Sequence, residues 1–302
     1  MKLPQITYKL IYQQHINYII RNINYRLRSI FSNLVQIPPS GKITINSDSG
    51  KFQMLTNQTS HISSLLFWNG YKKFEYSEIF EELSKKVDSF LDIGSNIGYY
   101  ALLAAKANPT IKILAFEPAL GPKFYLKNNI ELNGFGDNIT AIDIALSNQI
   151  GTIDFYEVEN QKYTYLQYNL AGEGNTGTKK TSRNFVKKTV KTTTLDQFAD
   201  TNIVTGIDLI KLDTEGTEID IIRSGASSIK KYEPIVISET LFNTIEKDLE
   251  LFFKELNYEM YNHTEKGLIK VNTITRVKDD GIRNCFFVPK SKLHLIAPYI
   301  NT

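Results

Sequence analysis

The chain has 302 residues, of which 42% are hydrophobic and 22% charged, a globular composition that excludes the disordered, collagen-like and coiled-coil classes. The net charge of +3 is too small to indicate a nucleic-acid-binding protein. Cys285 is the single cysteine and the four histidines are scattered, so we expect a reducing compartment, no disulfide and no metal site.

The N-terminal segment is basic and amphipathic. Residues 1–47 contain no acidic residue and six basic ones: Lys2, Lys9, Arg21, Arg26, Arg28 and Lys42. Apolar residues recur every three to four positions, apart from one longer gap, as on one helix face: Leu10, Ile16, Ile20, Ile23, Leu27, Ile30 and Leu34. Such a helix either packs on its own domain or binds an anionic membrane surface or a protein partner. Because no continuous apolar stretch indicates a secretory signal or a membrane span, we expect a cytoplasmic protein, peripheral to the membrane if this helix binds lipid.

A hairpin is predicted directly after this helix. Pro38 and Pro39 end the helix and mark a boundary. From Gly41 to about Thr56, two alternating runs flank the turn sequence Ser-Asp-Ser-Gly, which predicts two antiparallel strands. We therefore expect a helix-and-hairpin extension over residues 1–56 and a second domain over residues 57–302.

Short apolar runs then alternate with helical patterns. The runs are VDSFLDI, IKILAFE, NITAIDI, IDLIKLD and PIVISE, with helices expected over 97–107, 120–133 and 218–229. This alternation predicts an α/β fold with a parallel sheet buried on both faces. Further strands are expected over 151–158, 258–263 and 284–289. Residues 159–188 are rich in Gly, Ser, Thr and Asn and basic at their end, which predicts an insertion loop, either a solvated feature or a lid over the substrate.

A glycine-bearing turn follows the first of these strands, in FLDIGSNIGYY. The strand ends at Asp92, and Gly94, Asn96 and Gly98 form the turn before a helix. Such a turn lets a small ligand approach the backbone at a helix N-terminus. The spacing Asp-x-Gly-x-Asn-x-Gly is not the dinucleotide pattern Gly-x-Gly-x-x-Gly, so no phosphate is required. We expect these four residues to bind a cofactor, Asp92 either by accepting from the ligand or by holding the turn.

Acidic residues end the next two strands. Glu117 comes 19 residues after Gly98, where a carboxylate can accept hydrogen bonds from both ribose hydroxyls. Asp143 ends the third strand, where it can meet an adenine amine or remain exposed. Acids without neighbouring Arg or Lys suit a ligand with a ribose and a cationic centre, and suit a pyrophosphate poorly. S-adenosylmethionine has a sulfonium cation and no phosphate, so we expect it as the cofactor.

Over about residues 67–289 the chain resembles the FkbM-type S-adenosylmethionine-dependent methyltransferases. The resemblance is carried by FLDIGSNIGYYALLAAK, AFEPALGPKFYLKNNIELNG, IALSNQIGTIDFY, TTTLDQF and IDLIKLDTEGTEIDIIRSGASSI. It implies the class I methyltransferase fold, a Rossmann-like, mostly parallel sheet of seven strands with an antiparallel last strand, which residues 284–289 match. It also implies O-methylation of hydroxyl groups, often on sugars or polyketides. Residues 1–56 and 159–188 lie outside the resemblance and can carry the substrate choice.

A hydroxyl acceptor has to pass its proton to a base. Asp213 and Glu239 end the fourth and fifth strands, which open onto the same crevice as the glycine turn. We expect one of them to act as base or to orient the hydroxyl, with Glu215 next. Glu215 and Glu218 are alternatively acids that cap a helix. Lys211, on the buried fourth strand, needs an acidic partner from this crevice. Two carboxylates alone do not complete a ligand set for Mg²⁺ or Ca²⁺.

The sequence therefore predicts an enzyme that transfers a methyl group from S-adenosylmethionine to a hydroxyl, on a sugar of a polysaccharide or glycolipid. Its partner would be a small-molecule or glycan acceptor, not nucleic acid. One alternative is a nucleotide-dependent oxidoreductase, which the glycine spacing and the acidic strand ends disfavour. The other is a non-catalytic accessory protein of glycan assembly that has kept the fold and is tethered by the basic helix.

Overall fold

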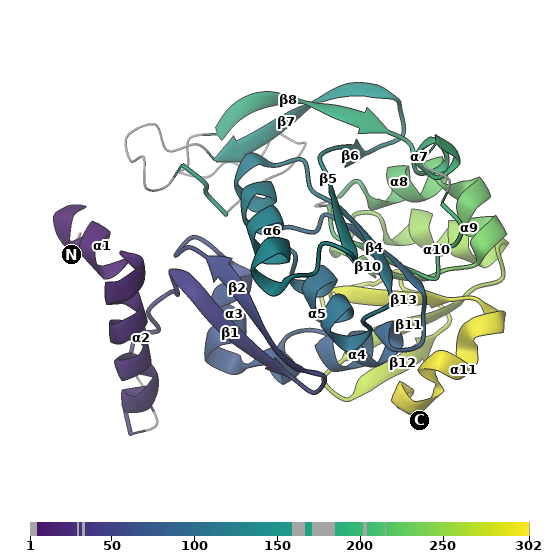
Figure 1. The fold of residues 1–302 in the computed structure, drawn as a ribbon. Coiled ribbons are helices and arrows are strands. Elements are labelled where there is room, and N and C mark those ends of the chain that lie inside the picture. The colour runs from purple at the N-terminus through teal and green to yellow at the C-terminus, as the bar shows by residue number, and fades with distance from the viewer. Residues whose placement is uncertain are drawn as a thin grey trace.

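The fold is built around one large sheet. The computed structural model describes residues 5–28, 30–31, 34–158, 167–170, 185–201, 204–214 and 216–301. Its central sheet has eight strands in the order β12-β11-β13-β10-β9-β3-β4-β5 (Figure 1). In that order the strands are Gly267–Val271, Glu259–Thr264, Asn284–Val288, Ile235–Glu239, Leu209–Leu212, Ser89–Ile93, Lys112–Phe116 and Ile139–Ile142.

Strand directions in this sheet confirm the predicted architecture and add one strand to it. Strands β5, β4, β3, β9 and β10 run parallel, and β13, the last strand of the chain, lies antiparallel between β10 and β11. These are the seven expected strands. The eighth, β12, pairs antiparallel with β11 at the sheet edge. It was not predicted from the sequence because its apolar residues, Leu268, Ile269 and Val271, form only a short run that Lys270 interrupts.

Helices cover both faces of the sheet, as expected for a parallel sheet. Successive strand residues point to opposite faces, and so Phe90 and Leu91 belong to two different apolar clusters. The first cluster includes residues of α3 (His61–Asn69), η1 (Tyr71–Lys73), α4 (Ser77–Ser84), α5 (Tyr99–Ala107), α6 (Leu120–Asn133) and α11 (Leu293–Ile296). The second includes residues of α7 (Leu195–Thr201), α8 (Glu218–Ser224), α9 (Ala226–Tyr232) and α10 (Glu246–Glu255). The 3₁₀ turns η3 (Lys290–Lys292) and η4 (Ala297–Tyr299) flank α11.

The predicted hairpin is present and packs on the large domain. Strands β1 (Gly41–Ser47) and β2 (Gly50–Thr56) pair antiparallel, and their inward side chains join the first apolar cluster. Asn129 and Asn133 of α6 fix β2, since their Oδ1 atoms accept from Leu55 N at 2.6 Å and Gln53 N at 2.8 Å. The hairpin and the large domain thus share one core.

The predicted N-terminal helix is two helices. They are α1 (Gln5–Ile11) and α2 (Gln14–Arg28), and both lie beside the hairpin at one edge of the molecule (Figure 1). The break between them follows from Gln13, whose Oε1 accepts from Ile16 N at 3.0 Å and so starts a new helix. None of the described helices is long and apolar enough to cross a membrane.

A small second sheet has the order β6-β8-β7. Strand β7 (Gly151–Val158) was predicted, whereas β6 (Ala145–Leu146) and β8 (Phe185–Thr193) were not. Most of the predicted insertion loop, residues 159–166 and 171–184, lies outside the described residues. Its last four residues, 185–188, belong to β8 and pair with β7. The loop prediction rested on the Gly, Ser, Thr and Asn content of the residues before β8, and it extended too far along the chain, into this strand.

Candidate active site

The glycine turn between β3 and α5 is tightly built. Gly94, Asn96 and Gly98 have positive φ angles of 74°, 52° and 89°. A Cβ atom on Gly94 would lie 2.0 Å from the backbone oxygen of Asp213, and one on Gly98 would lie 2.6 Å from Leu126 Cδ1. Neither position has room for a larger side chain, and both favour glycine conformationally. The predicted turn residues therefore shape a backbone cradle at the carboxyl end of β3.

Glu117 lies beside this turn, directly after β4. Its Oε2 accepts from Asn96 N at 2.9 Å and its Oε1 accepts from Ala119 N at 2.8 Å. Each carboxylate oxygen can accept a further hydrogen bond, and the side chain lines a cavity. Burial raises the pKa of Glu117 to about 7, an effect that the two backbone donors offset only in part. The site thus holds a fixed acceptor of the kind that two ribose hydroxyls need.

The cavity has a volume of about 630 Å³ and opens at the carboxyl ends of β3, β4, β9 and β10. Its acidic lining residues are Glu117, Asp213 and Glu239, and no Lys or Arg is among the described residues that line it. A low-dielectric hollow with three carboxylates favours a cationic ligand and opposes a phosphate. These residues fit S-adenosylmethionine. Glu117 would accept hydrogen bonds from its ribose, and the lack of a side chain at Gly94 would leave room for the cofactor beside the turn.

Lys211 and Asp92 form a buried ion pair beneath the turn. Lys211 Nζ lies 3.6 Å from Asp92 Oδ1 and 3.5 Å from Asp213 Oδ2, and it donates to Gly94 O at 2.8 Å. Burial by itself lowers the Lys211 pKa, but the carboxylates of Asp213, Asp92 and Glu75 outweigh it and raise that pKa. Asp92 and Asp213 are thus the acidic partners that Lys211 was expected to need. Asp92 is fully buried and does not line the cavity, so its contact with a cofactor stays a prediction.

The predicted catalytic acids differ in their placement. Asp213 and Glu239 both line the cavity, and the Asp213 side chain is 44% exposed. Glu215 lies outside the described residues. Glu218 is buried and accepts from Thr214 N at 2.7 Å and Gly216 N at 3.0 Å, which is the capping alternative. Within the described part of the chain, no three His, Cys, Asp or Glu residues are grouped so that they could hold a metal ion.

Asp143 lies apart from the cavity wall. Its carboxylate forms an ion pair with Lys123 at 2.5 Å, and its side chain is 54% exposed. The neighbouring Ile144 lines the cavity instead. Asp143 is thus not among the residues that line the cavity, and its contact with an adenine amine stays a prediction.

Several cavity residues were not predicted from the sequence. Thr59, Ser60 and His61 come from the start of α3, and Ile153 and Phe155 come from β7. The only local signal was Ser60, which caps α3 by accepting from Ser63 N at 3.2 Å. A helix cap indicates where a helix begins but not what it faces, so these residues could be found only in the folded chain.

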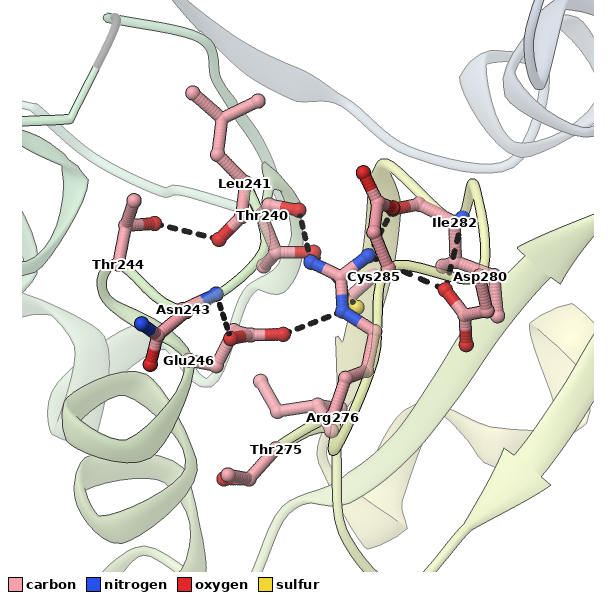
Figure 2. Close-up of polar contacts among 12 residues, drawn as sticks. Thr240, Leu241, Asn243, Thr244, Glu246, Thr275, Arg276, Asp280, Ile282 and Cys285 are labelled. Carbon is pink, nitrogen blue, oxygen red and sulfur yellow. Dashed lines mark hydrogen bonds and ion pairs between the residues drawn. The ribbon is translucent and has the colours of Figure 1, made fainter.

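Arg276 holds the segment that follows Glu239 (Figure 2). Its guanidinium donates to Thr240 O at 2.7 Å and pairs with the Glu246 carboxylate. Glu246 in turn accepts from Asn243 N at 2.7 Å. The side chains of Arg276 and Glu246 are almost completely buried, so this network fixes the backbone immediately after the Glu239 end of the cavity.

The sheet and the cavity together define a class of protein. The strand order with β13 antiparallel between β10 and β11, the glycine turn after β3 and the acid after β4 are those of a class I S-adenosylmethionine-dependent methyltransferase. The family model described as "Methyltransferase FkbM domain" matches residues 92–260, more than half of the chain. The chain therefore belongs to the FkbM methyltransferase family, which confirms the resemblance noted from its motifs.

Individual relatives are distant. The curated protein "Methyltransferase sdnD" of Sordaria araneosa is 33% identical over 87 residues, which cover 27% of this chain and only 34% of that protein. A solved methyltransferase FkbM from Methylobacillus flagellatus KT has a TM-score of 0.44 and 13% identity, over 90% of this chain and 60% of that one. A precorrin-6y C5,15-methyltransferase from Geobacter metallireducens GS-15 has a TM-score of 0.37 and 11% identity, over 70% and 86%.

Proposed function

We propose that this methyltransferase acts on oxygen, and that its acceptor is a hydroxyl group of a sugar in a polysaccharide or glycolipid. The observation that carries the proposal is that Asp213 and Glu239 line the same cavity as Glu117, the residue expected to bind the cofactor. A hydroxyl is a weak nucleophile until its proton is taken up, and a carboxylate beside it can do so. Nitrogen and thiolate acceptors do not need such a base to the same degree.

The residues of the chain can divide the work as follows. S-adenosylmethionine supplies a methyl group bonded to a sulfonium, so that bonding of the acceptor oxygen to the methyl carbon breaks the carbon–sulfur bond and leaves S-adenosylhomocysteine. Glu117 holds the ribose, and the Gly94 turn fixes the position of the cofactor against β3. Asp213 or Glu239 accepts the hydroxyl proton and later releases it to water. The cavity walls exclude bulk water and hold the oxygen in line.

The other lining residues support a polyhydroxylated acceptor. Six hydroxyl-bearing side chains line the cavity: Thr59, Ser60, Ser64, Ser147, Thr214 and Thr217. A hydroxyl both donates and accepts hydrogen bonds, as the hydroxyls of a sugar do. Phe155 adds an aromatic wall of the type that packs against the apolar face of a sugar ring. None of the described residues that line the cavity is a Lys or Arg that would pair with a pyrophosphate, so an oxidoreductase with a dinucleotide is not proposed.

The test is transfer of a labelled methyl group. The purified full chain is incubated with methyl-labelled S-adenosylmethionine and fractionated host polysaccharides and glycolipids, and the label is located by mass spectrometry. We expect a methyl ether on a sugar, less of it with Asp213→Asn or Glu239→Gln, and an unchanged amount with the control Asp248→Asn, because Asp248 pairs with Arg223 and does not line the cavity. Label on nitrogen or carbon contradicts O-methylation. S-adenosylhomocysteine binding without transfer to any fraction supports an accessory protein instead.

A further inference from the structure

The N-terminal helices and the residues after them leave an unusual amount of apolar surface exposed. Of the sixteen large hydrophobic side chains that are exposed in the described part of the chain, ten lie between residues 6 and 35. We call this set the N-terminal apolar surface: Ile6, Leu10, Tyr18, Ile19, Ile23, Tyr25, Leu27, Ile30, Phe31 and Val35. Scattered exposed apolar residues are normal, but such a cluster in one short segment marks an interaction surface.

The exposure follows from the way in which α2 is docked. Its buried residues are polar, namely Asn17 and Arg21. Arg21 Nη1 donates to Ser40 O at 2.7 Å, and Asn17 Oδ1 accepts from Ser40 N at the same distance. Asn17 also donates to Pro38 O at 3.2 Å. The helix therefore uses its polar side to hold the linker to the hairpin, which leaves Ile19 and Ile23 exposed on another side of the helix.

Aromatic contacts also attach α2 to the domain. Tyr25 stacks on Trp68, and the guanidinium of Arg28 lies over the same ring at 5.3 Å. Ile19 and Ile23, four positions apart on the helix, remain 58% and 54% exposed. The helix α2 thus does pack on its own domain, as one alternative predicted, but through its polar side chains and aromatic rings and not through Ile19 and Ile23.

The charge around the N-terminal apolar surface indicates which kind of partner it binds. Residues 1–47 carry six positive charges and no negative one, whereas the rest of the chain has a net charge of −3, because the total is +3. Lys9 and Arg26 are exposed on α1 and α2. A helix with exposed apolar residues and only basic charges fits the boundary between anionic headgroups and acyl chains.

We propose that α1, α2, residues 30–31 and residues 34–35 lie on the surface of an anionic membrane, with the N-terminal apolar surface in contact with the lipid. Pro38 lines the active-site cavity, and its carbonyl accepts a hydrogen bond from Asn17 of α2. The membrane-bound helix is therefore connected directly to one wall of the cavity. This proposal does not depend on the identity of the methyl acceptor.

The test is cosedimentation of the full chain with phosphatidylcholine vesicles that contain or lack phosphatidylglycerol. We expect binding to the anionic vesicles, weakening as salt is added. The double substitution Ile19→Asp and Ile23→Asp should reduce binding by about tenfold or more. Leu251→Asp is the matched control, since Leu251 on α10 is 51% exposed and outside this surface. A second variant, Lys9→Glu with Arg26→Glu, should remove the preference for anionic lipid.

S-adenosylhomocysteine binding and circular dichroism should be unchanged in these variants, because the substituted side chains are exposed and outside the cavity. Absence of wild-type binding to anionic vesicles overturns the proposal, as does equal binding by the Ile19 and Ile23 variant. A wild-type dimer that this variant dissociates, without vesicle binding, also overturns it and assigns the surface to a second copy of the chain.

Discussion

Acidification is expected to weaken cofactor binding through Glu117. The carboxylate accepts two backbone hydrogen bonds and has acceptor capacity left toward the cavity. Ribose hydroxyls donate to the ionised carboxylate, whereas a proton on Glu117 competes with them. Burial has raised the pKa of this group to about 7. Ligand binding therefore favours the ionised form, and the affinity falls as the pH drops through neutrality.

The size of the effect follows from that pKa. If the bound form is fully ionised, the dissociation constant scales with one plus the ratio of protonated to ionised Glu117. For a pKa of about 7 it rises about tenfold between pH 8 and pH 6. Glu117→Gln removes the charge, and each charge-assisted hydrogen bond is worth about 1.5–3 kcal/mol. The variant should thus bind roughly 10- to 150-fold more weakly at pH 8 for each bond lost.

The same raised pKa predicts a stability effect of opposite sign. The folded, ligand-free protein binds the Glu117 proton more tightly than the unfolded chain does. Burial of the charge therefore costs about 3 kcal/mol above pH 7, and this cost disappears as the pH falls toward 4.5. Compared with Glu117→Gln, the ligand-free wild type should gain stability over this interval.

The assay is isothermal titration with S-adenosylhomocysteine at pH 6, 7 and 8, for wild type, Glu117→Gln and the control Asp248→Asn. Subtracting the pH dependence of Glu117→Gln removes any contribution from titration of the ligand itself. The control should follow the wild type, because Asp248 is an exposed carboxylate that pairs with Arg223 and does not line the cavity. Equal affinity of wild type and Glu117→Gln, or the same pH dependence in both, would refute the assignment of Glu117 to the ribose.

Three further predictions concern residues near the cavity. Asp213→Asn should lower methyl transfer by about 10²- to 10⁴-fold if it is the base, with little change in S-adenosylhomocysteine affinity; wild-type turnover would exclude that role. Lys211→Met should lower the free energy of unfolding, measured with urea, by about 3–5 kcal/mol, because Asp92 is left buried without its cation. Adding Asp92→Asn should recover much of this loss, and no recovery would contradict the pairing. Arg276→Ala should cost a similar amount, since it leaves the Glu246 carboxylate buried and unpaired; Arg276→Lys should lose less, and equal losses would mean that the charge does not matter.

Local sequence patterns were sufficient for the sheet and for part of the site. Buried parallel strands read as short apolar runs because both of their faces are covered, so β3, β4, β9 and β10 were recognisable one by one. Their carboxyl ends lie at one edge of the sheet. The residues that follow them, Glu117, Asp213 and Glu239, could therefore be placed together before the structure was known, and all three line the cavity.

Other features depend on contacts between distant parts of the chain. Strand β12 has a single buried residue and forms only because β11 is beside it. His61 reaches the cavity because the linker and α3 pack over the strand ends, and no pattern around His61 records that packing. Asp92 was expected to face the ligand or hold the turn, but its carboxylate pairs with Lys211 from the neighbouring strand.

The N-terminal helices show most clearly which properties depend on the local sequence and which depend on the tertiary structure. Composition showed that this segment is basic, and periodicity predicted an amphipathic helix, because helical periodicity depends on residues three or four positions apart. The helix ends at Arg28, however, so Ile30 and Leu34, which the periodicity included, lie beyond it. Which face would be buried depended on partners far along the chain, the backbone of Ser40 and the ring of Trp68. Hydrogen bonds and ring contacts to these residues bind one side of α2 to the domain. Only the tertiary structure decided that Ile19 and Ile23 would remain exposed.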